Sequence, residues 1–109
     1  MLSSTTDTLQ GYRITEYLGI CNGEAVSGTN LFRDFFAGIK DKLGGRVGGY
    51  QNAFAECTRA AFADAVAMAE RQGADALLGV RFQPVTMVGN DRTILGVTVT
   101  ATAVRVQKI

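Results

Sequence analysis

The stretch from residue 28 to residue 50 constrains the fold more than any other part of the chain. Asn30 can cap a helix by accepting a hydrogen bond from a backbone N–H two or three residues later. Two glycine pairs within residues 44–49 then end this helix and provide a hinge. We therefore predict an amphipathic helix that leads into a second one. Its buried face consists of apolar side chains at helical spacing, namely Phe32, Phe35, Phe36, Ile39 and Leu43.

The second predicted helix runs from Tyr50 to about Gln72, and Gly73 ends it. Alanines cover much of its surface, so that other elements can approach it closely on more than one side. This suits packing against both its own sheet and a neighbouring subunit, although simple helix propensity explains the alanines equally well. The apolar stripe comprises Tyr50, Phe54, Cys57, Ala61, Ala65 and Met68.

Two strands are expected before the helices. Residues 1–6 are rich in serine and threonine and lead into turn residues up to Gly11, which suits an edge strand. Residues 13–27 predict a long strand whose apolar phase changes along its length. Either this strand is bent, or Asn22 and Gly23 form a tight hairpin turn, and the sequence leaves both alternatives open.

Two further strands are expected after the helices, over residues 76–82 and 93–108. The loop between them contains Pro84 and the turn signal at residues 89–91, and we predict that the strands pair as an antiparallel hairpin. The apolar phase of the last strand flips at residues 103–104, so that either a bulge lies there or its two halves face different partners. At about 3.3 Å per residue this strand would span about 50 Å. It must therefore bend or reach beyond a compact subunit of this size.

The composition indicates a small globular protein without a strong charge. A chain of 109 residues suits a single domain over residues 1–109, and a hydrophobic content of 47% excludes a disordered class. A net charge of +1 with 19% charged residues creates no field that would attract nucleic acid or an anionic membrane. No apolar run has the length of a signal peptide core or a membrane span. We therefore expect a soluble cytoplasmic protein with no nucleic-acid or membrane partner.

The residue types argue against catalysis and against a tight metal site. The chain contains no histidine, which is the usual general base near neutral pH and a common ligand for transition metals. Cys21 and Cys57 are expected to be buried thiols without a disulfide. Their possible co-ligands are only carboxylates, a poor set for a soft metal. We therefore predict no catalytic residue, no cofactor and no metal site. The carboxylates in question are Glu16, Glu24, Asp34 and Glu56.

The glycine-rich segment at residues 44–49 has the flexibility of an anion-binding loop at a helix N-terminus. It lacks the Gly-Lys-Ser/Thr ending of a P-loop and the spacing of a dinucleotide-binding fingerprint, so a hinge is the favoured interpretation. Arg46 and Arg33 are the candidate ligand-binding residues. Their alternative role is an interface salt bridge to Asp34, Asp41 or Glu56.

Five segments carry a family resemblance that covers nearly the whole chain, namely residues 16–19 (EYLG), 23–25 (GEA), 28–41 (GTNLFRDFFAGIKD), 44–46 (GGR) and 73–76 (GADA). Together they resemble the YbjQ-like family, which is also labelled heavy-metal-binding. The resemblance implies an α+β subunit, similar in class to dodecin-type folds, that assembles as a homopentamer. It implies no established activity.

The chain departs from the family pattern at several positions. Relatives often carry acidic residues in the strand after Gly79, whereas residues 81–85 contain none. A metal site that used those carboxylates would therefore be absent here. Other departures are Val47, Gly49 and Gln51, where the pattern has Ser, Ala and Glu, and Ala101, where it has Ser or Gly.

The sequence thus predicts an α+β fold in which a small, mostly antiparallel β-sheet packs with two α-helices and assembles into a homo-oligomeric ring. The predicted function is a noncatalytic, cytoplasmic, pentameric module for binding or scaffolding, with an unknown ligand. The alternative is a small flavin-like or nucleotide-like ligand bound at subunit junctions through Arg33 and Arg46. Heavy-metal binding ranks third, and an enzyme ranks last.

Overall fold

The computed structural model describes residues 1–27, 48–89 and 92–109. The predicted first helix, most of the glycine hinge and the turn at Asn90 and Asp91 lie outside the described residues. In chain order, the described elements are β1 (Leu2–Ser3), β2 (Tyr12–Ser27), α2 (Gly48–Arg71), β3 (Ala76–Gly89) and β4 (Arg92–Lys108).

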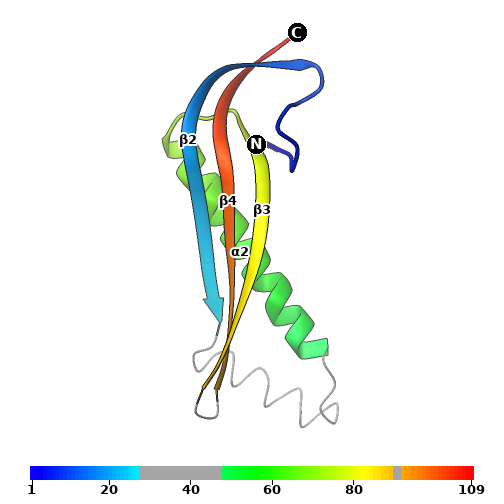
Figure 1. Cartoon of the computed structure of the whole chain (residues 1–109), viewed down its shortest axis with the longest axis vertical. Helices are drawn as coiled ribbons and strands as arrows, with labels where there is room; N and C mark the ends of the chain where they lie inside the picture. Colours follow the sequence, from blue (N-terminus) through cyan, green and yellow to red (C-terminus); the bar gives the residue numbers. More distant parts are fainter. Residues whose placement is uncertain (28–47, 90–91) are drawn as a thin grey trace.

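The four strands form one mixed sheet in the order β1-β3-β4-β2. β4 is antiparallel to both of its neighbours, β2 and β3, whereas the short β1 runs parallel to β3. α2 crosses one face of this sheet diagonally (Figure 1). The described chain is therefore a two-layer α+β unit, and the predicted antiparallel pairing of the last two strands is confirmed.

β2 is one bent strand rather than a hairpin. It pairs with β4 without a break in direction from Tyr12, opposite Lys108, to Ser27, opposite Leu95. The register shifts twice near the start of β2, and Gly19 there has a φ of 116°, a conformation that favours glycine. These irregularities let β2 curve over the end of the sheet (Figure 1). The structure thus decides between the two alternatives for this segment.

The prediction that Pro84 lies in a loop is wrong, because β3 continues through it to Gly89. Pro84 pairs with Val97 of β4 on one side. On its other side, β1 and the segment after it bond to β3 from Ala76 to Val80, and no described strand pairs with β3 there at Pro84. A proline is tolerated there because no neighbouring strand needs its missing N–H.

Gly73 ends α2 as the sequence predicts. It has a φ of 79°, and its N–H donates to the carbonyl of Glu70. The N–H of Ala74 donates to the carbonyl of Ala69, which completes a Schellman motif. The helix therefore stops at Arg71, and the chain turns directly into β3.

The core lies between α2 and the sheet and is lined by unusually small helix residues. The buried stripe is Ala53, Cys57, Ala61, Ala65 and Ala69, at intervals of four residues. Phe54 and Met68, which the sequence placed in the stripe, are only half-buried at its flanks. Small side chains form the central line because β2 passes very close to the helix at Gly23. A Cβ built on Gly23 would collide with the backbone of Ala61 and Ala65.

The apolar side chains of the two halves of β4 pack on opposite faces of the sheet. This is one of the two alternatives predicted for the last strand, the other being a bulge at residues 103–104. Ala103 belongs to the cluster beneath α2, whereas Val104 belongs to a second cluster on the opposite face. The second cluster also contains Ala76 and Leu78, with half-buried Leu9, Ile14 and Val106 around it. The register irregularity lies in β2, between Tyr17 and Gly19, opposite this point.

The described unit is elongated. Its longest extent is 55 Å, and its radius of gyration of 17.2 Å exceeds the roughly 13 Å expected for a compact domain of this length. The long strands lie along this axis (Figure 1). The sequence argument assumed a compact subunit, from which the last strand would have to bend or protrude. That assumption is wrong, because the described unit is itself elongated. Within the described ranges, no helix has both the length and the apolarity needed to cross a membrane.

Candidate functional site

Arg33 and Arg46, the predicted ligand-binding residues, lie outside the residues that the structure describes, as do Asp34 and Asp41. Glu56, another predicted partner for these arginines, forms an ion pair with Arg59 one turn along α2. Both side chains are largely exposed, so this pair contributes little to stability. Among the predicted partners of the two arginines, the structure therefore places only Glu56, and on the outer surface of the helix.

The two cysteines are buried thiols that are not joined by a disulfide, as predicted. Cys21 lies on β2, and Cys57 lies on α2 with its Sγ 4.0 Å from the carbonyl oxygen of Leu95. Burial raises the pKa of the Cys21 thiol, and a backbone hydrogen bond only partly opposes this effect. This shift disfavours the thiolate form that a nucleophile or a metal ligand requires.

The face of the sheet turned away from α2, here called the outer face, is a candidate interaction surface of the described chain. Its centre is a row of threonines on β4, comprising Thr98, Thr100 and Thr102, which alternate with buried residues that face α2. Polar side chains on the two neighbouring strands flank this row. They are Asn22 and Glu24 on β2 and Arg81 and Gln83 on β3.

Exposed apolar side chains surround this polar centre. Tyr17 and Ile20 on β2 are 70% and 79% exposed, and Val26 on the same strand is 66% exposed. At the far end of the sheet, Gly96 lies between Val26 and Val85 in the register. Because Gly96 has no side chain, a shallow groove of about 160 Å³ remains between the two valines.

One edge of the sheet is partly closed by a side chain from the helix. The carboxylate of Asp64 accepts a hydrogen bond from the backbone N–H of Glu24 at 3.3 Å. This N–H points away from β4, so Asp64 occupies a group that another strand could otherwise use. The β2 edge is therefore blocked to strand addition at Glu24.

A second hollow lies at the opposite edge, between β3, α2 and the segment after β1. Phe62 of α2 and Phe82 of β3 stack there with ring centroids 6.0 Å apart. The hollow has a volume of about 310 Å³ and is open to solvent. Its other lining residues are Ser3, Ser4, Thr5 and Val80. An aromatic pair beside hydroxyl groups can contact a flat ligand or an apolar side chain of another protein.

The comparison with protein families decides what kind of chain this is. The model of the YbjQ_1 family, described as "Putative heavy-metal-binding", matches residues 1–107. The chain belongs to the YbjQ family. The predicted resemblance is therefore confirmed over almost the whole sequence.

A solved structure supports the fold of this YbjQ-family chain. It is a protein of unknown function from Pediococcus pentosaceus, assigned to the DUF74 family. The two chains share 16% sequence identity with a TM-score of 0.69, and the similarity covers 98% of each chain. At this identity the similarity establishes the α+β fold alone.

The heavy-metal description of the YbjQ family can be tested against the donor groups. Within the described ranges, no group of three or more His, Cys, Asp or Glu residues is close enough to hold a metal ion. The two thiols lie on different elements inside an apolar cluster that also contains Ala61, Ala65 and Val99. Soft-metal sites need several converging thiolate or imidazole ligands. The described residues therefore do not fit a metal centre.

Sequence reasoning missed the outer face as a candidate site. It recognised the alternation of Thr98, Thr100 and Thr102 with apolar residues only as a strand pattern. The same alternation indicates that one face of the strand is polar. It does not indicate which residues of the neighbouring strands lie beside that face. The positions of Arg81 and Glu24 relative to these threonines depend on the strand register, which has bulges in both neighbouring strands.

Proposed function

We propose that this chain is a noncatalytic cytoplasmic module that assembles into a homo-oligomeric ring, with binding or scaffolding as its function. Five subunits is the expected number, because the YbjQ-like family resemblance implies a homopentamer. The ligand or partner that such a ring would bind is not identified.

The observation that carries this proposal is the apolar surface on the outer face. Ile20 and Val26 leave most of their side-chain surface in water, although both lie within a regular strand. Covering one such side chain contributes about 1.5 to 3 kcal/mol. Large aliphatic groups gathered on one sheet face are typical of a surface that another protein covers. The elongated shape agrees with a subunit that gains its cover from neighbours.

The properties of the two cysteines support a noncatalytic function. Cys21 and Cys57 are buried, and burial raises the pKa of Cys21. In the absence of histidine, these thiols have no imidazole base that could activate them. We therefore assign no reaction to the chain.

Native mass spectrometry together with light scattering of the purified protein tests the assembly. The expected mass is five times that of the 11.6 kDa chain. A ring of another size would correct the subunit number and leave the assembly intact. A chain that stays monomeric at micromolar concentration would overturn the proposal.

A second candidate is the binding of a small aromatic ligand at a subunit junction, and the hollow beside Phe62 and Phe82 favours it. Such a ligand would stack on the exposed ring of Phe82 and contact the hydroxyl groups of the segment after β1. The measurement is the absorbance spectrum of freshly purified protein. Absorbance at wavelengths longer than the protein band would support this candidate if Phe82→Ala abolishes it. If the fully assembled protein shows only the absorbance of the polypeptide, this result would count against the candidate.

A further inference from the structure

The two long edges of the sheet carry complementary side chains on the outer face. We propose that copies of this chain join head to tail, with the β2 edge of one copy against the β3 edge of the next. Glu24 and Ile20 form the β2-edge surface, and Arg81 and Leu2 form the β3-edge surface. In this junction Glu24 faces Arg81 of the next copy, and Ile20 packs on its Leu2. The inference rests on the proposed homo-oligomeric function and specifies which surfaces meet.

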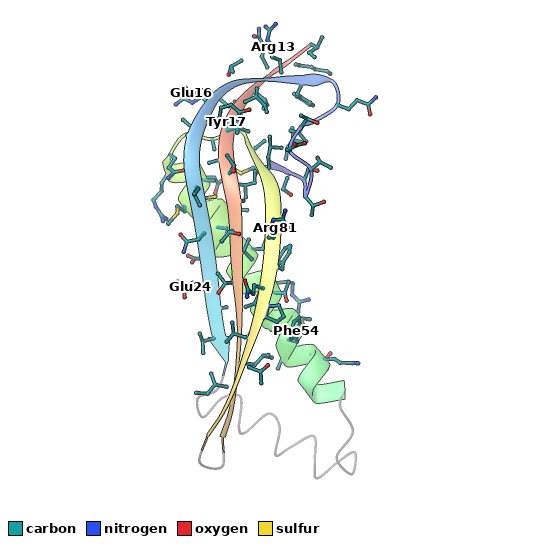
Figure 2. The ribbon with its side chains drawn as sticks, in the orientation of Figure 1. Arg13, Glu16, Tyr17, Glu24, Phe54 and Arg81 are labelled. Atoms are coloured by element: carbon teal, nitrogen blue, oxygen red, sulfur yellow. The ribbon has the colours of Figure 1, made fainter. Side chains whose placement is uncertain are left out.

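The packing of neighbouring residues places both charged side chains on the outer face. Gly23 faces α2, since a Cβ there would meet the carbonyl oxygen of Ala61, so Glu24 points the other way. Arg81 lies between Val80, which is buried beneath α2, and Phe82, which stacks on a helix residue. Figure 2 shows Glu24 and Arg81 on the two strands that flank β4.

Both charges are exposed and available. Within the described parts of the chain, neither Glu24 nor Arg81 forms an ion pair. β4 lies between their strands, so each is closer to its own edge of the sheet than to the other charge. One edge therefore presents a carboxylate and the other a guanidinium, which is the arrangement that a head-to-tail contact needs.

The strand register shows that the two contacts occur together. In the strand register, Arg81 pairs with Thr100 of β4, and Glu24 pairs with Thr98 of β4. Thr98 and Thr100 are two residues apart and are consecutive side chains on the outer face, so Glu24 and Arg81 are offset by one such row. A stagger of one row between copies therefore brings Glu24 level with Arg81 of the neighbour.

The same stagger determines what Ile20 meets. Ile20 lies level with Thr102, so the shift brings it level with Val104 and hence with Ala76 of the neighbour. Leu2 of β1 pairs directly with Ala76 and is 44% exposed. Since Ile20 is 79% exposed, one stagger matches both a charge pair and an apolar pair.

The hydrogen bond from Glu24 to Asp64 determines the nature of the contact. Because the outward N–H of Glu24 is already donated to Asp64, the neighbour cannot form a regular strand ladder at this level. The junction is therefore made by side chains. Since the two surfaces differ, repetition of the contact cannot give a two-fold dimer, and it generates a ring when the rotation between copies closes.

Charge reversal tests the pairing in the full chain. Glu24→Arg and Arg81→Glu, made singly, each place like charges at every junction. Each should raise the protein concentration at half-dissociation about tenfold or more. The two changes combined in one chain should restore assembly toward that of the unaltered protein. Glu70→Arg, the same charge change at an exposed position of α2, is the matched control and should leave the mass unchanged.

Crosslinking tests the direction of the contact. Chains with Glu24→Cys and chains with Arg81→Cys are co-expressed and treated with a short bis-maleimide. Crosslinked dimers should form in the mixture and not in either variant alone. The unaltered chain, whose own cysteines are buried, measures the background. Dimers in Glu24→Cys alone would indicate a two-fold contact and overturn the head-to-tail arrangement.

The outcomes separate this inference from the proposed function. If the unaltered chain assembles but both charge reversals leave its mass unchanged, the edge pairing is wrong and the oligomeric function stands. If the unaltered chain is monomeric, both proposals fail. Circular dichroism of each variant confirms that a change in mass does not result from unfolding.

Discussion

The two faces of the sheet differ in how far their apolar side chains are buried. On the face beneath α2, Val99 and Ala101 are at most 5% exposed, and the helix that covers them contributes mainly alanine. On the outer face, Ile20 and Tyr17 are at least 70% exposed and border a row of threonines. One face is thus completed within the chain by close packing of small residues. The other keeps large apolar groups in water, which agrees with the proposed assembly.

Close packing on the inner face depends on the absence of side chains at one crossing point. β2 approaches α2 at Gly23, where the backbone of Ala61 and Ala65 leaves no room for a Cβ. The outer face has its own glycine, Gly96, but a Cβ built there would meet nothing closer than 3.5 Å. The two glycines therefore offer a direct comparison of the two faces.

The largest effect is expected for Gly23→Ala. Its Cβ would lie 2.5 Å from the amide nitrogen of Ala65 and still closer to the carbonyl oxygen of Ala61, so β2 and α2 must separate. We expect a loss of about 3 kcal/mol or more in the free energy of unfolding, measured by urea denaturation. Gly96→Ala is the control and should cost less than about 1 kcal/mol. Equal losses for the two substitutions would show that the inner face is not the tighter one.

The next effect compares a large side chain on each face. Leu77 is fully buried beneath α2, so Leu77→Ala should lower the free energy of unfolding by about 3 kcal/mol. Ile20→Ala should change it by less than about 0.5 kcal/mol at concentrations where the chain is monomeric, because the side chain is already in water. Denaturant unfolding at two protein concentrations checks both values. A large loss for Ile20→Ala in the monomer would mean that its own chain covers this residue.

The smallest effect concerns the thiol on the inner face. Burial raises the pKa of Cys21 in the folded chain above that of the unfolded chain. The unfolded thiol therefore releases its proton first, and stability should fall as the pH rises above about 8.5, the ordinary thiol pKa. Stability measured from pH 7 to pH 10 should decline less in Cys21→Ala than in the unaltered chain. Identical declines would show that Cys21 does not titrate in this linked way.

Local sequence signals predicted most of the described elements because their causes are local. Gly73 ends α2 since glycine readily takes the positive φ of the Schellman motif, and the alternation in residues 97–103 predicts a strand in any context. The prediction of a loop at Pro84 was wrong because its outcome depends on a non-local property. Proline excludes a central strand but not an edge, and position within a sheet is not a local property.

The candidate site was less predictable than the elements. The sequence pointed to Arg33 and Arg46, on segments outside the described residues, and it did not single out Arg81 or associate it with Glu24. These two residues are 57 positions apart in sequence, by subtraction of 24 from 81. Their relation depends on register shifts in β2 and β3, and a shift of one residue would turn either side chain to the other face.

The amino-acid sequence by itself determined the element types, the end of α2, the pairing of the last two strands and membership of the YbjQ family. Hydrophobic periodicity and the conformational freedom of glycine depend on only a few neighbouring residues, and the absence of histidine is a property of the composition. All three can therefore be recognised without coordinates. Only the tertiary structure decided that β2 stays a single strand, that β3 runs through Pro84 and that Ile20 and Glu24 lie together on an open face. Those features arise from strand order and bulges, where packing between distant segments selects one arrangement among several that the local signals allow.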